Sequence, residues 1–208
     1  MSNKRRINIQ SANMTKQQFF RTRIYFTAIV AIATWLLLIM NHFHGGVPSH
    51  HILADKDLPA VSNWWGAIVL PLLTWLLLHR IQKGAFYNHD SSTETLHLLR
   101  QRLFGFIGAL LFGAVLSTCF TFGYTDVCGY MVLCLFPLAL FIPIYRAEYQ
   151  LGFVLGMTFT FGAVLPTMVE AILSLAGLVI YLYIRSGLLY VGAKITLLWP
   201  QGKFKANK

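Results

Sequence analysis

The chain has 208 residues, of which 56% are hydrophobic and only 12% are charged, and its formal net charge is +10. Charged residues this sparse cannot cover the surface of a water-soluble domain, and the mean hydropathy of +0.59 points the same way. The apolar residues come in runs close to the length of about 20 residues that crosses a hydrocarbon core of roughly 30 Å. The composition therefore excludes an ordinary soluble protein, and we expect no nucleic-acid partner despite the positive charge.

In chain order, the predicted elements begin with a basic leader, residues 1–23, with no small-residue cleavage site after the apolar run that follows it. This run therefore predicts a retained anchor. A single transmembrane domain, residues 24–199, comes next, and a basic tail, residues 200–208, ends the chain. The fold class is an all-α polytopic membrane bundle of about six helices, at 24–40, 64–79, 103–122, 129–145, 151–165 and 171–189. Residues 186–200 either prolong the last helix or lie along the membrane interface.

Local patterns refine two of these elements. The stretch "SSTETLHLLRQR" before the third span predicts a short amphipathic helix. Small residues four apart predict close helix contacts, because they let backbones approach each other in lipid. They are Ala109, Gly113 and Ser117 in one span, and Gly152 and Gly156 in another.

Lys and Arg are distributed asymmetrically among the predicted loops. The leader, residues 80–102, the "YRAEYQ" break at 145–150 and the C-terminal part of the chain from Arg185 onward hold sixteen of the seventeen, all except Lys56. Because cytoplasmic segments retain basic residues, both termini are predicted to be cytoplasmic. The basic skirt favours anionic lipid headgroups at that face. We expect an integral protein of a bacterial inner (plasma) membrane.

The loop between the first two spans, residues 41–66, is rich in groups that bind metals. Imidazole and carboxylate together suit Zn²⁺, Cu²⁺ or Fe. Four histidines and two aspartates therefore predict a divalent-metal site on the non-cytoplasmic face, and a solvated connector is the alternative. The candidate ligands are His42, His44, His50, His51, Asp55 and Asp57.

A tryptophan pair opens the second span. Trp64 and Trp65 are typical of interfacial anchors, because indole is apolar but carries an N–H group that seeks water. The alternative is a flat wall for a haem or a lipid headgroup, which makes haem the second candidate cofactor. Ser62 or Asn63 is suited to cap the helix that follows.

Two acidic residues are predicted to reach the same outer end as the histidine-rich loop. Asp126 lies in a short turn between spans, and Glu170 lies near the start of the sixth span. Thr167, Glu170 and Ser174 form one polar stripe on a helix, which predicts that the stripe faces the bundle interior or a water-filled pocket. Either carboxylate could serve as a general base. A helix-end carboxylate in interfacial water is the alternative for Glu170.

Three function classes fit these features. The first is a metal- or haem-dependent membrane enzyme that acts on a lipid or lipid-linked substrate, with metal-activated water as the reagent. The second is a small transporter or channel that uses the stripe around Glu170. The third is a non-catalytic scaffold or complex subunit that binds a membrane partner or forms a homo-oligomer.

Overall fold

The computed structural model describes residues 2–43, 49–51, 60–86 and 92–198, and side chains in residues 16–43, 62–86 and 94–194. Within these ranges the chain is helical apart from one short β-hairpin and a few turns. Four stretches are long and apolar enough to cross a membrane: Lys16–Phe43, Asn63–Phe86, Glu94–Thr121 and Val164–Lys194. The chain therefore has the build of a helical membrane protein, as its composition predicts.

A two-stranded hairpin joins the first two helices. β1 (Ser49–His51) pairs antiparallel with β2 (Ala60–Ser62), with Ser49 opposite Ser62. A 3₁₀ turn, η2 (Asn63–Trp65), follows at once. The hydroxyl of Ser62 accepts a hydrogen bond of 3.4 Å from the backbone N–H of Trp64. Ser62 and Asn63 were the two candidates for the helix cap, and Ser62 is the one that acts as the N-cap.

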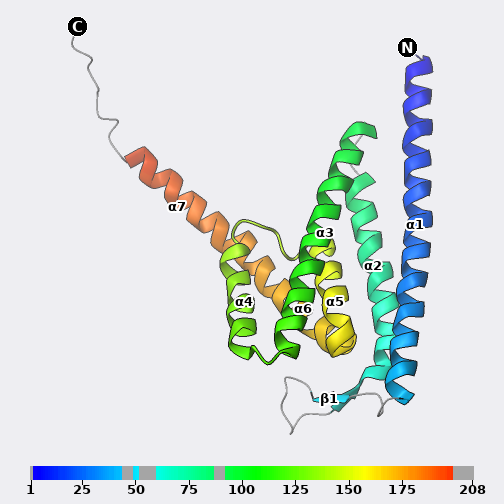
Figure 1. Cartoon of the computed structure of the whole chain (residues 1–208). Coiled ribbons are helices and arrows are strands. Elements are labelled where there is room, and N and C mark those ends of the chain that lie inside the picture. The colour runs from blue at the N-terminus through cyan, green and yellow to red at the C-terminus, as the bar shows by residue number, and fades with distance from the viewer. Residues whose placement is uncertain (1, 44–48, 52–59, 87–91, 199–208) are drawn as a thin grey trace.

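The first two helices lie side by side at one flank of the molecule (Figure 1). α1 (Ser2–Phe43) joins the basic leader and the first span in one continuous helix, and α2 (Gly66–Phe86) returns antiparallel to it. Arg23 of α1 is only 6% exposed. Its Nη1 donates a hydrogen bond of 3.0 Å to Oε1 of Gln82, and its guanidinium lies 3.7 Å from the ring centroid of Trp75. A cation thus fixes α1 against α2.

α3 (Ser92–Thr121) and α5 (Ala147–Phe161) make the most extensive helix contact in the described chain. Their backbones meet at glycines. A Cβ on Gly156 would overlap the carbonyl oxygen of Leu110, and a Cβ on Gly113 would crowd the backbone of α5. Such close approach favours helix association in lipid through dispersion. The contact predicted from the small-residue spacing is confirmed.

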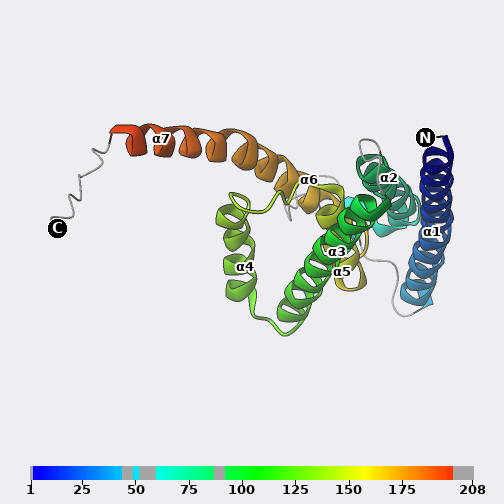
Figure 2. The same ribbon diagram turned by 90° about the horizontal axis from the view of Figure 1, so that it is seen from above.

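α4 (Thr125–Leu138) lies beyond α3, on the side away from α1 and α2 (Figures 1 and 2). Residues 139–146 then run to α5 through turns that are held by local hydrogen bonds. One of them joins the N–H of Ile142 to the carbonyl oxygen of Leu138 at 2.9 Å. This irregular segment carries the chain from α4 back to the centre of the bundle.

The last long element is one helix made of three segments. α6 (Val164–Val179) continues through a single π-helical turn, η3 (Ile180–Ile184), into α7 (Arg185–Leu198). Both views show α7 projecting away from the other helices (Figures 1 and 2). Residues 186–198 therefore prolong the last helix, which was one of the two predicted alternatives.

Two predicted boundaries need correction. The stretch "SSTETLHLLRQR" is helical, but it forms the first turns of α3, because no glycine or proline interrupts residues 92–104. The predicted spans 129–145 and 151–165 correspond to α4 and α5, which have 14 and 15 residues. At 1.5 Å per residue these helices are about 21 and 22 Å long, short of a bilayer core of roughly 30 Å. Six full spans are therefore not confirmed.

Candidate functional site

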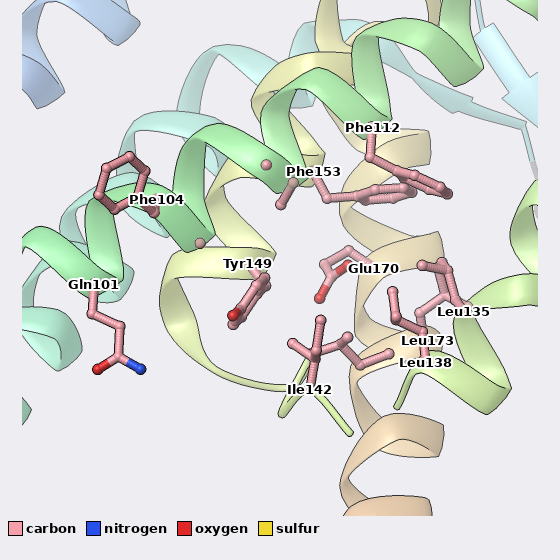
Figure 3. Close-up of a pocket in the computed structure, with 14 residues that line it drawn as sticks. Gln101, Phe104, Phe112, Leu135, Leu138, Ile142, Tyr149, Phe153, Glu170 and Leu173 are labelled. Carbon is pink, nitrogen blue, oxygen red and sulfur yellow. The ribbon is translucent and has the colours of Figure 1, made fainter. Parts of the chain in front are cut away.

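A cavity of about 490 Å³ lies between α3, α4, α5 and α6 (Figure 3). Its size and its largely apolar wall are typical of small-molecule sites, which measure roughly 300–1,000 Å³ and carry few polar groups. The wall consists of Gln101, Phe104, Gly105, Gly108, Ala109, Phe112, Leu135, Leu138, Ile142, Ile144, Tyr149, Phe153, Glu170 and Leu173.

Two glycines of α3 leave space on the helix face that borders the cavity. The ring of Tyr149 packs against Gly105, where a Cβ would lie 3.1 Å from Cζ of the tyrosine. Three residues further on, a Cβ on Gly108 would meet no described atom within 4 Å. Because neither glycine has a side chain, α3 can contact α5 closely and still border an open volume.

The irregular segment between α4 and α5 forms another wall of the cavity. Ile142 and Ile144 from this segment line it, together with Leu138 at the end of α4. Pro137 precedes the segment and Pro143 lies within it, and the two prolines prevent a regular helix from continuing through it. Irregular backbone at membrane depth is tolerated where it is covered by protein or lines a cavity. The placement of this segment agrees with that requirement.

Glu170 is the acidic group of the cavity. It lies six residues into α6 and is 8% exposed, and its carboxyl group points into the cavity (Figure 3). No described residue donates a hydrogen bond to this carboxyl group or forms an ion pair with it. The two hydroxyls of the predicted stripe have other partners: Thr167 donates to the carbonyl oxygen of Ala163 at 2.7 Å, and Ser174 accepts from the amide of Gln150.

The cavity has two further polar side chains, both near the beginnings of their helices. Tyr149 comes from the first turn of α5, and Gln101 from the early part of α3 (Figure 3). Gln101 is exposed, and so are Phe104 (62%) and Leu138 (42%). The cavity therefore reaches the outer surface, where apolar residues of a membrane protein face acyl chains.

The neighbouring charged side chains have partners outside the cavity. Nη1 of Arg102 donates a hydrogen bond of 2.8 Å to the carbonyl oxygen of Ile81 on α2. Nε of Arg146 lies 3.8 Å from Oε1 of Glu148, which is 3% exposed. None of these three charged residues lines the cavity. The electrostatic character of the cavity is therefore set by Glu170 within an apolar and aromatic wall.

The other end of the bundle holds a cluster of aromatic side chains. Trp64 contacts Trp35 edge-on at a centroid distance of 6.5 Å, and it contacts His42 at 6.1 Å. Trp64 and Trp65 are 42% and 62% exposed. Exposed indoles that contact one another at a helix end favour the predicted role of interfacial anchors.

The predicted metal ligands are described only in part. His44, Asp55 and Asp57 lie outside the described residues, and His50 and His51 are described only as backbone in β1. Asp126 is exposed in the first turn of α4 and does not line the cavity beside Glu170. Within the described residues, no three His, Cys, Asp or Glu side chains come together in a group that could hold a metal ion.

A buried asparagine connects η2, the turn before α2, to the turn between α5 and α6. Asn63 is 2% exposed, and its Oδ1 accepts a hydrogen bond of 3.1 Å from the backbone N–H of Ala163. Gly162 has φ +72, and a Cβ there would overlap the Asn63 side chain. This contact was not predicted from the sequence. It fixes the start of α6, and therefore the position from which Glu170 extends.

Comparison of the chain with models of protein families, with curated proteins and with solved structures finds no match. A functional assignment therefore depends on the chemistry of the residues themselves. The cavity around Glu170 is where the described side chains combine open volume, an apolar wall and a reactive group.

Proposed function

We propose that this protein is a small membrane carrier that takes up an amphipathic molecule from the bilayer into the Glu170 cavity. The observation that carries the proposal is a cavity of about 490 Å³ that contains one unpaired carboxyl group in an apolar wall. The apolar wall suits the hydrocarbon part of such a ligand. Glu170, Tyr149 and Gln101 offer hydrogen bonds to its polar end.

Two features of the backbone support a carrier. The segment 139–146 interrupts the helical structure at the cavity, and interrupted helices form the binding sites of many secondary transporters. The π-helical turn at Ile180–Ile184 follows α6 directly, and such turns occur frequently at functional sites. Both features are interruptions of regular α-helix, at which the backbone can rearrange locally while the α-helices on either side stay intact.

Binding must precede transport, so binding at this cavity is the step to test first. A neutral long-chain alcohol that carries a photoreactive diazirine is the probe, and peptide mapping locates the cross-links. We expect labels on cavity residues such as Tyr149, and strong loss of labelling in Gly108→Leu, whose side chain would occupy the open volume.

Gly129→Leu is the matched control, because a Cβ on Gly129 also meets no described atom within 4 Å, but this residue of α4 does not line the cavity. This variant should label like the unmodified protein. Labelling that avoids the cavity residues, or that is equal in the two leucine variants, would contradict the proposal.

We also propose that both termini are cytoplasmic, on the basis of the distribution of Lys and Arg. The helix directions fit this orientation, because α1 begins and α7 ends toward the same end of the molecule (Figure 1). In a cysteine-free background, Asp126→Cys should react with an impermeant thiol reagent in intact cells. Arg80→Cys should react only after the cells are permeabilised, and the reverse pattern would overturn the assignment.

The metal site predicted for the histidine-rich loop has its own test. We expect a transition metal in the purified protein and its loss in the double variant His42→Ala, His44→Ala. Metal-free protein, or a metal content unchanged in the double variant, would exclude the hypothesis of a metal-dependent enzyme with its site in this loop.

A further inference from the structure

We infer that the ligand of the Glu170 cavity is an amphipathic cation, and that each monovalent cation bound releases one proton from Glu170. The inference deepens the proposed function, because it names the ligand class of the same cavity. It rests on three observations: the unpaired carboxyl group, the absence of a cation from the cavity wall, and the aromatic rings around it.

The unpaired carboxyl group sets the charge state of the empty cavity. An ionised carboxylate in an apolar environment costs several kcal/mol unless a counter-ion or hydrogen-bond donors compensate it. Glu170 is 8% exposed, and no described residue provides either form of compensation. The empty cavity therefore holds the neutral acid, and a bound cation supplies the missing counter-ion.

The titratable groups on the surrounding elements do not supply Glu170 with a counter-ion. On α3, Arg102 donates to the carbonyl oxygen of Ile81 on α2, and the other titratable residues of this helix, Glu94, His97, Arg100 and Cys119, do not line the cavity. On α5 and just before it, Glu148 and Arg146 face each other, and Tyr149 is the other titratable group in the cavity wall. Glu170 is the one titratable residue of α6. None of the titratable side chains of α4 lines the cavity; they are Asp126, Cys128, Tyr130 and Cys134.

The aromatic rings favour a cation independently of Glu170. Phe104, Phe112, Tyr149 and Phe153 all contribute to the cavity wall, and Phe112 and Phe153 stack at a centroid distance of 6.2 Å. The faces of aromatic rings attract cations, most strongly where water is excluded. An anionic ligand would be repelled by the ring faces and would find no counter-ion in the cavity wall. A neutral ligand would gain only the apolar contacts and hydrogen bonds.

The binding step balances without any further reagent. A cation and the neutral carboxylic acid give an ion pair and one free proton, so the charge of the cavity does not change. A protein that moves this ligand across the bilayer would exchange it for a proton. A proton gradient could then drive the transport of the cation.

The experiment compares two probes of similar shape in detergent-solubilised protein. Tetraphenylphosphonium has a fixed positive charge, and triphenylphosphine oxide is neutral. Titration calorimetry gives both affinities, and a pH indicator in weakly buffered solution counts the protons released. We expect tetraphenylphosphonium to bind at least about tenfold more tightly and to release close to one proton, because an ion pair with little water around it is a strong interaction.

Two variants separate this inference from the proposed function. Glu170→Gln should lose the roughly tenfold preference for the cation over the neutral probe and should release no proton when the cation binds. Gly108→Leu should lose both probes. If the neutral probe binds, Gly108→Leu abolishes its binding, and the cation has no advantage or releases no proton, the inference is wrong and the proposed function stands.

If neither probe binds, or if Gly108→Leu binds both as before, the proposed function fails and the inference fails with it. Should Glu170→Gln not fold, the proton count of the unmodified protein still decides, because a count near zero overturns the inference. Glu170→Asp then serves as a second variant. It keeps the carboxyl group and should retain proton release.

Discussion

Arg23 and Glu170 are both buried ionisable residues in candidate membrane spans, but their surroundings differ. Arg23 is enclosed by partners: its Nη1 contacts Oε1 of Gln82 and Nδ1 of His79, and its guanidinium lies over Trp75. Glu170 borders an open cavity of about 490 Å³ and has no described hydrogen-bond or ion-pair partner. Groups within the described chain compensate the charge of Arg23, whereas none of them contacts the carboxyl group of Glu170 in this way.

This contrast distinguishes an ionisable group that holds helices together from one that we propose binds a ligand. An ionisable side chain inside a membrane is costly, so it persists where it stabilises the fold or acts on something else. Arg23 holds two helices together. Glu170 lies where an external group could contact it, and the α3–α5 glycine contact leaves that space open. If the contrast is correct, substitutions at the two residues should have opposite effects on stability and on binding.

The largest loss of stability is expected from Gly156→Leu. This substitution tests whether the α3–α5 contact beside the cavity tolerates an added side chain. A side chain at Gly156 would collide with the backbone of α3 at Leu110, and backbone cannot rotate away as a side chain can. We expect a loss above the roughly 1–3 kcal/mol typical of overpacking. The measurement is the free energy of unfolding in mixed detergent micelles. Gly108→Leu should fold normally, and equal losses in the two variants would contradict an open interior.

Arg23→Ala should give the next largest loss, about 2 kcal/mol, because it removes a charged hydrogen bond, a cation–π contact and the packing of a long side chain. The same unfolding assay measures the loss. Arg23→Met is the informative control, since it keeps most of the side-chain length but removes the charge and the donors. A Met variant as stable as the unmodified protein would show that the partners of Arg23 contribute nothing. The contrast with Glu170 would then fail.

A loss of about 1–2 kcal/mol is expected for Asn63→Ala, which leaves the buried N–H of Ala163 without its acceptor. Because this contact fixes the start of α6, the variant should also weaken ligand binding in the cavity. Thermal unfolding and binding of the neutral probe are both measured. Ser62→Ala, which removes the 3.4 Å hydrogen bond to Trp64 at an exposed position, should have a smaller effect on stability and none on binding.

The sequence was sufficient to predict the membrane class, a helix cap at Ser62 or Asn63, and close helix packing at the small residues of α3 and α5. These features depend on local composition or on residue spacing along one helix, such as Gly152 and Gly156. The number of full spans was harder to predict, because hydropathy does not show that Pro137 and Gly162 end α4 and α5 early. Local breaks of this kind shorten a helix without making the sequence less apolar.

The cavity could not be predicted in the same way, because its wall combines side chains from five segments between residues 101 and 173 whose packing the sequence does not specify. The many histidines and aspartates favoured the loop at 41–66 as the site, whereas the cavity needs only one carboxyl group and two glycines. The sixth span was predicted to start at residue 171, next to Glu170. The helix in fact starts at Val164, where the preceding turn is fixed by Asn63, and this places Glu170 almost two turns inside. A contact across 100 residues leaves no pattern in one sequence.

The smallest effect on stability is expected from Glu170→Gln, and this substitution tests the comparison most directly. Glutamine keeps the shape of the side chain but removes the ionisable proton. Because the carboxyl group has no described partner, no ion pair or hydrogen bond is lost within the chain. We expect the free energy of unfolding to change by less than about 1 kcal/mol, and any change to be an increase, since the carboxyl group must take up a proton when it is buried, whereas an amide is already neutral.

Glu148→Gln is the matched control for that measurement, because Glu148 is equally buried but lies 3.8 Å from Nε of Arg146. Removal of its charge should lower stability, while binding of the neutral probe stays unchanged. Glu170→Gln should keep or raise the stability and should weaken the binding of the cation. If it destabilises the protein as much as Glu148→Gln does, the carboxyl group of Glu170 has a structural partner within the fold. Its position in the cavity would then resemble that of Arg23 in the α1–α2 contact, and the distinction between a structural and a functional charge would no longer hold.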